Sequence, residues 1–260
     1  MLLAVDVGNT NIMLGVYHQE RLVTYWRVST NRQSTEDEYG VLVKNLFHQR
    51  GIKDSNIKEM IISTVVPTLR YPLEEMGKKY FQVSPLVVGP GVKTGLNILM
   101  DNPKEVGADR IVNAVGALGL YGGPLIVVDF GTATTFCVIS QDGSYLGGAI
   151  APGINISTEA LFKKAAKLPR VEFVRPHKVL GKDTISSMQS GIFYGFVGQV
   201  DGVVKNLMKE INQKPKVVAT GGLARIISKE SETINEVNLF LTLEGLRIIN
   251  ARNRRQEKTK

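Results

Sequence analysis

The chain has 260 residues, of which 43% are hydrophobic and 22% are charged, and its formal net charge is +8. This composition is globular and excludes a disordered or fibrous chain. The apolar runs stop well before membrane-spanning length, and a single cysteine, Cys137, excludes an internal disulfide or a zinc cluster of several cysteines. We therefore expect a cytoplasmic protein with no membrane partner, and its positive charge suits anionic substrates.

The N-terminal segment predicts a strand, Leu2–Val7, that carries an acidic side chain, Asp6, near its end. No basic residues precede this apolar run, so it does not resemble a signal peptide. A turn at Gly8–Asn11 follows, and two further strands are expected over 12–17 and 22–28. Together these segments predict a hairpin.

A helix is expected next, because Ser34 stands three residues before Asp37 and Thr35 three residues before Glu38, the spacing of a capping box. The remaining pattern indicates a mixed α/β half. It predicts a short strand at 60–63, a helix near 69–81 and a strand near 85–88.

The same order of segments then restarts. An apolar strand, Leu125–Phe130, again carries an aspartate near its end, Asp129, and a turn at Gly131–Thr134 follows. Strands are expected at 135–139, at 144–150 and at 216–219, the last of which runs into a Gly-Gly pair. The two aspartates are 129 − 6 = 123 residues apart, which fits a duplicated domain. We expect one half at 1–115 and a second at 116–260.

Both turns have the composition of a phosphate site. Glycine lets the backbone approach a phosphate oxygen, and backbone N–H groups with Asn or Thr side chains can donate to it. A carboxylate would repel phosphate but can hold Mg²⁺, which bridges to the phosphates. One such turn is weak evidence, whereas two turns after apolar strands and a late Gly-Gly pair together favour a nucleotide site.

Competing signatures are absent from the sequence. Gly77-Lys78 and Gly181-Lys182 lack the hydroxyl residue that a P-loop needs next, and Gly89-Pro90-Gly91 lacks the third glycine of a dinucleotide fingerprint. The three histidines show no metal or triad spacing, and we expect each on the surface or in a loop.

These motifs resemble the superfamily of acetate and sugar kinases, Hsc70 and actin, and within it the type III pantothenate kinases. The closer resemblance lies in Gly107–Ala114, Gly147–Gly153 and Gly181–Thr184, and it extends over almost the whole chain. It implies an α/β fold of duplicated ribonuclease H-like (actin-like ATPase) domains, whose mixed sheets are flanked by helices, with a nucleotide cleft between the domains.

The resemblance also implies an activity, the ATP-dependent phosphorylation of pantothenate, which begins coenzyme A biosynthesis. It implies Mg²⁺ and a monovalent cation, K⁺ or NH₄⁺, held by Asp129. Thr132 would contact ATP, and Asp109 would be the catalytic base. The first loop would bind ATP through Asp6, Val7, Gly8, Asn9, Thr10, Asn11, Ile12 and Met13. The pantothenate site would comprise Gly107, Ala108, Asp109, Arg110 and Thr184.

The chemistry of the residues supports two of these roles independently. A hydroxyl that attacks the γ-phosphate needs a proton acceptor, and a carboxylate suffices because proton loss can be late in a loose transition state. Asp109 stands at the expected start of a helix, where the dipole favours a negative charge. Arg110 could pair with a substrate carboxylate, although on spacing alone the two residues also fit a helix cap and a surface charge.

One position departs from the family. Met100 precedes Asp101-Asn102-Pro103, where the family commonly has tyrosine. A thioether replaces a phenol that could bond to or stack on the substrate, but Met100 could still pack against the gem-dimethyl group of pantothenate.

Four glycines, Gly191, Gly195, Gly198 and Gly202, fall on one face of an expected helix. Each weakens the helix by up to about 1 kcal/mol relative to alanine, so close approach of another backbone should compensate. That backbone would belong either to the same subunit or to the second copy in a homodimer, which the resemblance implies.

The basic tail Arg252–Lys260 is expected to be frayed and solvated, and nucleic acid is not an expected partner because no recognised binding motif accompanies it. Two alternatives to the main hypothesis remain. The chain could be a related kinase acting on another small hydroxyl or carboxylate substrate. It could also be a nucleotide-binding accessory protein of transcription, although such a protein would not need the base Asp109.

Overall fold

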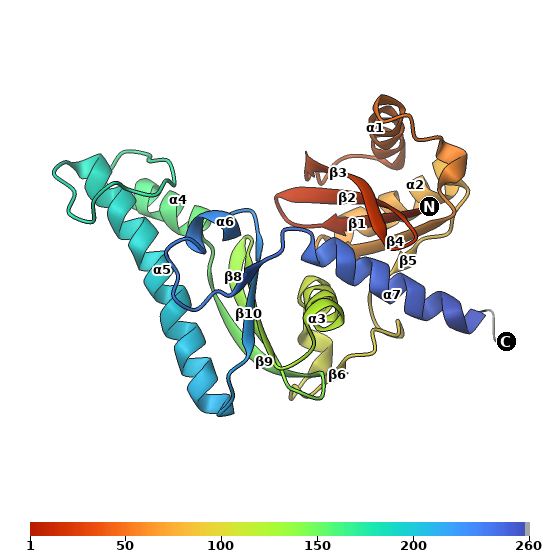
Figure 1. Ribbon diagram of the computed structural model, residues 1–260. Helices are drawn as coiled ribbons and strands as arrows, with labels where there is room; N and C mark the ends of the chain where they lie inside the picture. The colour runs from red at the N-terminus through yellow and green to blue at the C-terminus, as the bar shows by residue number, and fades with distance from the viewer. Residues whose placement is uncertain (258–260) are drawn as a thin grey trace. The chain divides into compact units, whose positions relative to one another are not determined.

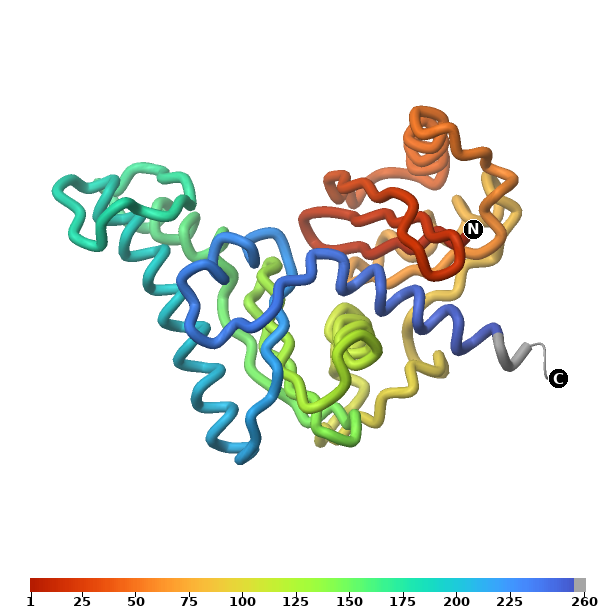
Figure 2. The backbone as a smooth tube through the Cα atoms, viewed as in Figure 1, coloured from red at the N-terminus to blue at the C-terminus, as the bar shows by residue number. Residues whose placement is uncertain are grey.

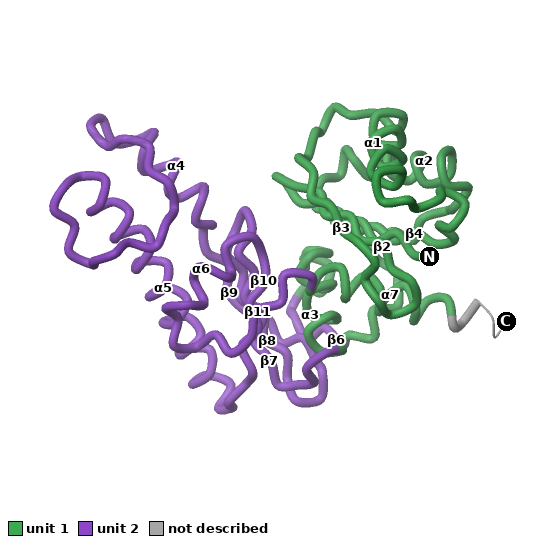
Figure 3. The backbone as a smooth tube through the Cα atoms, turned by 45° about the horizontal axis from the view of Figure 1, so that its top comes forward, with its two compact units in different colours: residues 1–96, 102–119, 241–260 green, residues 97–101, 120–240 purple. Residues whose placement is uncertain are grey.

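The computed structural model describes residues 1–257, with side chains to residue 254. The chain forms two compact units that are not continuous in sequence (Figure 3). Unit 1 comprises Met1–Leu96, Asn102–Gly119 and Leu241–Lys260, and unit 2 comprises Asn97–Asp101 and Leu120–Phe240. The expected halves, 1–115 and 116–260, assigned the last helix to the second half, whereas its contacts group it with unit 1.

Unit 1 is built on a five-stranded mixed sheet in the order β3-β2-β1-β4-β5 (Figure 1). β1 pairs antiparallel with β2 and parallel with β4. The strands are β1 (Leu2–Val7), β2 (Asn11–His18), β3 (Arg21–Ser29), β4 (Glu59–Thr64) and β5 (Leu86–Val87). The helices are α1 (Glu36–Gln49), η1 (Asp54–Asn56), η2 (Pro67–Leu69), α2 (Arg70–Phe81), η3 (Pro103–Glu105), α3 (Ala108–Tyr121, whose last two residues belong to unit 2) and α7 (Leu241–Glu257).

The apolar alternation of β1 explains its place at the centre of this sheet. Leu3, Val5 and Val7 point to one face and join a core with residues of α1 and α2, among them Phe47 and Met76. The predicted capping box is confirmed at the start of α1, where Thr35 and Glu38 satisfy each other's backbone groups.

Unit 2 is built on a six-stranded mixed sheet in the order β11-β10-β7-β8-β9-β6 (Figure 1). β7 pairs antiparallel with β8 and parallel with β10. The strands are β6 (Asn97–Ile98), β7 (Leu125–Phe130), β8 (Ala133–Ile139), β9 (Ser144–Pro152), β10 (Lys216–Gly221) and β11 (Glu236–Val237). The helices are α4 (Ile154–Lys164), α5 (Thr184–Ile211) and α6 (Ala224–Ile227).

The two sheets repeat one topology, and this confirms the predicted duplication of fold. In each unit a first strand is flanked by its antiparallel hairpin partner on one side and by a parallel strand on the other. The repeat extends to register, because Asp6 pairs with Ser63 of β4 and Asp129 pairs with Thr220 of β10. Each aspartate therefore occupies the same place in its own sheet.

The exposed glycine face of α5 has no partner within the described chain. A Cβ atom built on any of its four glycines meets no heavy atom within 4 Å. The alternative that these glycines accommodate another backbone of the same subunit is therefore wrong for the described residues. The continuous trace of α5 is easiest to follow in Figure 2.

The prediction of a frayed tail is wrong for its first three residues. Arg252 donates to the carbonyl of Thr94, and the Asn253 amide exchanges hydrogen bonds with the backbone of Lys93. Arg254 forms an ion pair with Glu59. These contacts hold the end of α7 to unit 1, while the side chains of the remaining tail lie outside the described residues.

Over residues 1–257, no helix is both long enough and apolar enough to cross a membrane.

A buried carboxylate on α5 secures the loop that follows α6. Asp201 is 8% exposed and accepts hydrogen bonds from the hydroxyls of Ser231 (2.6 Å) and Thr233 (2.7 Å) and from the backbone N–H of Glu232 (3.0 Å). Burial by itself raises the pKa of Asp201, but these hydrogen bonds outweigh it and hold the pKa below its ordinary value.

We predict that Asp201→Asn lowers the free energy of unfolding by about 1–3 kcal/mol at pH 7, because the donors lose a charged acceptor. Because the pKa of Asp201 is lower in the folded protein than in the unfolded chain, its carboxylate stabilises the fold at any pH above the unfolded-state pKa of about 3.9. This stabilisation is lost as the pH falls through the lower pKa of the folded state. Urea unfolding of both proteins should therefore give a gap in stability that narrows between pH 5 and pH 3. A gap that is the same at both pH values would contradict this.

Candidate functional site

The first candidate turn follows β1 in unit 1. The N–H of Gly8 donates to the carbonyl of Asn11 (3.0 Å), and a Cβ atom at Gly8 would lie only 3.1 Å from that same oxygen. Residue 8 is therefore glycine because the turn closes on it. Thr30, just after β3, fixes the turn from outside, since its hydroxyl donates to the carbonyl of Gly8 (2.7 Å).

The tip of this turn is open to a ligand. Asn9 and Thr10 are exposed, and Arg32 donates to the side-chain oxygen of Asn9 (2.9 Å). Exposed backbone and side-chain donors next to a guanidinium are suited to bind an anion. The predicted phosphate residues of unit 1 thus lie in one tight turn.

Asp6 lies half-buried at the carboxyl end of β1, two residues before Gly8, where this turn begins. Its register partner on β4, Ser63, is fully buried, and the Ser63 hydroxyl has no hydrogen-bond partner in the described structure. Register partners on neighbouring strands point to the same face. A half-buried carboxylate at the end of a strand is an oxygen ligand of the kind that Mg²⁺ binds.

The second turn follows β7 in unit 2 and is one residue shorter. It has two residues, Gly131 and Thr132, between its strands, where unit 1 has three, and the N–H of Gly131 donates to the carbonyl of Ala133 (3.1 Å). Thr132 is exposed. Gly153 at the start of α4 packs against this turn so closely that a Cβ there would lie 2.7 Å from the carbonyl oxygen of Gly131.

Asp129 lies half-buried beside Gly221, the last residue of β10. Gly221 has a φ of +92°, and a Cβ on it would lie 2.6 Å from Oδ1 of Asp129. Glycine therefore lets the backbone of β10 lie directly against the carboxylate, where any side chain would collide. Carboxylate oxygens are ligands that a hard cation such as K⁺ accepts.

Asp109 lies in the first turn of α3, as predicted. Its Oδ1 accepts a hydrogen bond from the N–H of Arg110 (2.8 Å), and both residues are half-buried. A Cβ on Gly107 would lie 2.5 Å from the same oxygen. The carboxylate thus folds back over Gly107, and this contact gives a physical reason for the Gly-Ala-Asp-Arg order.

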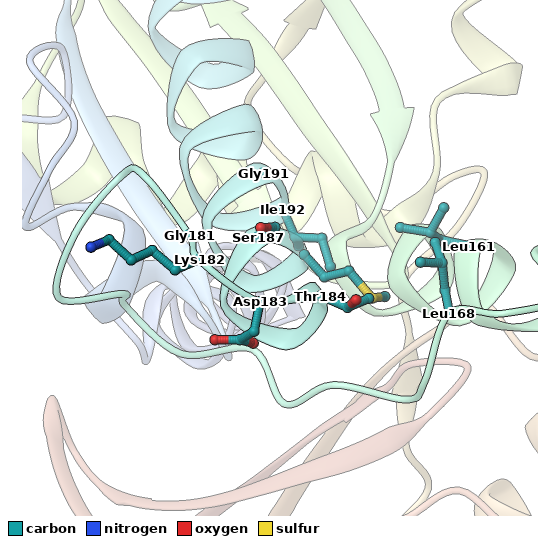
Figure 4. Close-up of a pocket in the computed structure, with 10 residues that line it drawn as sticks. Leu161, Leu168, Gly181, Lys182, Asp183, Thr184, Ser187, Gly191 and Ile192 are labelled. Carbon is teal, nitrogen blue, oxygen red and sulfur yellow. The ribbon is translucent and has the colours of Figure 1, made fainter.

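Thr184 begins α5 and lines a pocket of about 740 Å³ in unit 2 (Figure 4). Asp183 caps the helix, and the pKa of its carboxyl lies below the ordinary value because the Ser186 backbone N–H and hydroxyl donate to it. Leu161 and Leu168 form the facing side of the pocket. The pocket therefore offers an exposed hydroxyl opposite an apolar wall.

Met100 follows the short strand β6, and its sulfur lies next to β9. A Cβ on Gly147, whose φ is +131°, would come within 3.2 Å of Sδ. Met100 thus packs on Gly147 of β9. Local sequence pattern does not predict this contact, because it depends on pairing between segments 47 residues apart.

The structure distributes the predicted site residues between the two units. Unit 1 holds the first turn with the Gly107–Arg110 segment, and unit 2 holds Met100, Asp129, Thr132 and Thr184. Sequence reasoning did not identify Ser63 beside Asp6 or the role of Gly221 beside Asp129. A single buried serine has no recognisable pattern in one sequence. The Gly-Gly pair is recognisable in the sequence, but its contact with Asp129 is not.

Two mixed sheets of the same topology, each with an Asp-x-Gly turn at the end of its first strand, define the duplicated fold of the actin-like ATPases. Solved structures agree in fold. An Arthrobacter polyphosphate/ATP-glucomannokinase covers 98% of each chain at a TM-score of 0.52 and 12% identity. A Campylobacter jejuni protein assigned to a Baf family of transcriptional activators covers 97% of this chain and 99% of its own at a TM-score of 0.61 and 20% identity.

The family follows from sequence. A model of type III pantothenate kinases matches residues 2–206. A type III pantothenate kinase from Halalkalibacterium halodurans is 59% identical over 253 residues, which cover 97% of this chain and 100% of the relative. The chain belongs to the type III pantothenate kinase family.

We predict that Gly221→Ala destabilises the protein more than Gly51→Ala. Both glycines have positive φ, but a Cβ at Gly51 meets nothing within 4 Å, whereas one at Gly221 collides with Asp129 and the backbone of Phe130. Gly51→Ala should cost about 1–2 kcal/mol for backbone strain alone. Chemical unfolding should show a loss at Gly221→Ala of about 3 kcal/mol or more, and equal losses would count against the contact.

Proposed function

We infer that the chain is an ATP-dependent kinase that phosphorylates pantothenate to 4′-phosphopantothenate, the first step of coenzyme A biosynthesis. The observation that carries this inference is the carboxylate of Asp109, presented in the first turn of α3 over Gly107 in a chain of the type III pantothenate kinase family.

In the proposed reaction the primary hydroxyl of pantothenate attacks the γ-phosphorus of ATP. The new O–P bond forms as the bond from that phosphorus to the bridging oxygen of ADP breaks, and ADP leaves with the electron pair. Asp109 accepts the hydroxyl proton, which can leave late because the transition state is loose. The hydrogen bond from the Arg110 N–H to Oδ1 leaves Oδ2 as the acceptor.

The phosphates of ATP are proposed to lie against the turn from Asp6 to Met13, with Thr132 as a further contact. The support is the exposed tip of the first turn and its neighbour Arg32. Mg²⁺, when bound at Asp6, would neutralise phosphate charge. Asp6 would hold the ion directly or through water.

A monovalent cation, K⁺ or NH₄⁺, is proposed to bind at Asp129. The support is the half-buried carboxylate itself, which stands at the end of β7 in the place that Asp6 has at the end of β1. This assignment gives the two strand-end aspartates different ions.

Pantothenate is proposed to contact the Gly107–Arg110 segment, Thr184 and Met100. Arg110 would pair with the substrate carboxylate, and the hydroxyl of Thr184 would bond to a polar group of the substrate. The Met100 thioether, placed on Gly147, would pack against the gem-dimethyl group.

ADP release in the presence of K⁺ tests this proposal, with pantothenate, a panel of sugars, and acetate as acceptors. We expect ADP release with pantothenate as the acceptor and none with the sugars or acetate. Turnover with a sugar or acetate and not with pantothenate would favour a related kinase, and ATP binding without turnover would favour the accessory-protein alternative.

We predict that Asp109→Asn lowers kcat for pantothenate by about 10² to 10⁴, with ATP affinity nearly intact, because the amide cannot accept the proton. Steady-state kinetics with calorimetric ATP binding measures both. An unchanged kcat would remove Asp109 from the role of base.

We also propose a homodimer in which the glycine face of α5 meets a second copy. Four exposed glycines weaken a 28-residue helix without any compensating contact within the described chain. Gly195→Arg should block this close approach and give a monomer in light scattering, whereas Val41→Arg on the exposed face of α1 should not. A Gly195→Arg protein that remains dimeric would overturn this interface.

A further inference from the structure

Helices α3 and α7 cross within unit 1 at a backbone contact between two glycines. A Cβ on Gly116 would lie 2.5 Å from the carbonyl oxygen of Leu241 and 3.0 Å from the backbone nitrogen of Gly245. A Cβ on Gly245 would collide with the carbonyl of Val112. The two helices therefore touch through their backbones, which leaves little freedom for α3 to slide or tilt.

A hydrogen bond fixes the register of this crossing. The hydroxyl of Thr242 donates to the side-chain oxygen of Asn113 at 2.7 Å, across 129 residues of chain. Asn113 is 2% exposed, so the bond is shielded from water. Asn113 stands four residues after Asp109, which places the two residues on one face of α3, one turn apart.

The other side of α7 packs on the sheet that carries the first phosphate turn. Leu243 of α7 is fully buried. A Cβ on Gly15 of β2 would lie 2.7 Å from one of the methyl carbons of Leu243. β2 leaves the turn that follows Asp6. Figure 1 shows α7 running between this sheet and α3, so one helix connects the element that holds phosphate to the element that begins with the base.

We propose that Thr242 and Gly245 are positioning residues of the kinase: through Asn113 and Gly116 they set where Asp109 stands relative to the Asp6 turn. This inference rests on the proposed function, because it needs Asp109 as the base. A displacement of about 1 Å at a reacting group can cost up to about 100-fold in rate, so a partial shift of α3 should affect catalysis without disturbing ATP binding.

Thr242→Val and Thr242→Ser test the proposal. Valine keeps the volume of the side chain and deletes the donor. The kcat with pantothenate should therefore fall about tenfold, less than the loss of up to about 100-fold expected for a full displacement of about 1 Å. The KM for ATP should stay within about twofold. Serine keeps the donor and should restore kcat to within about threefold of the original protein. Each rate is divided by the folded fraction, measured by thermal unfolding at the assay temperature.

Arg254→Gln is the matched control, because it removes the ion pair with Glu59 at the far end of the same helix. It should lower the melting temperature and leave kcat unchanged. If Thr242→Val, like this control, has a lower melting temperature but an unchanged kcat, the positioning role is overturned. If Thr242→Val does not fold, Thr242→Ala, which deletes the donor with a smaller side chain, decides: a normal kcat in Thr242→Ala overturns the role. A normal kcat in Asp109→Asn defeats the proposed base itself, which is a separate outcome.

Discussion

The structure depends on one constraint that it meets twice: a carboxylate must stand at the end of a strand whose other residues are buried. β1 and β7 are central strands, and the residues before Asp6 and Asp129 have almost no exposed surface. A charge buried there without a partner would cost several kcal/mol. In both units the chain therefore turns on a glycine two residues after the aspartate. The aspartate is left at the carboxyl end of its strand, where cations and phosphates can reach it.

The two turns differ in length and surroundings, and these differences underlie our proposal that they bind different ions. The first has three residues between its strands and exposes Asn9 and Thr10 beside Arg32, and it has the Ser63 hydroxyl in register with Asp6. The second has two residues and lies against Gly153, with Gly221 beside its aspartate. We ascribe phosphate and Mg²⁺ to the first turn and a monovalent cation to the second.

Local pattern predicted most of the strands, the capping box of α1, both turns and the place of Asp109, because strand alternation, glycine conformation and helix capping act over a few residues. Partnerships across the chain could not be predicted. Three such contacts depend on packing between segments that are distant in the sequence: Gly245 with α3, Met100 with Gly147, and Arg252 with Thr94. The family resemblance predicted site residues, while the physical reason for Gly107 or Gly221 appeared only in three dimensions.

The most direct test of the central claim compares Asp6→Asn with Asp129→Asn in one titration of ATP binding and turnover against Mg²⁺ and K⁺. We predict that Asp6→Asn weakens Mg²⁺-ATP binding about tenfold or more, which is one lost charged ligand of roughly 1.4 kcal/mol or more, and leaves the K⁺ midpoint of turnover unchanged. Asp129→Asn should instead shift the K⁺ midpoint and leave the Mg²⁺ dependence intact. Identical shifts for both ions in the two variants would contradict the account.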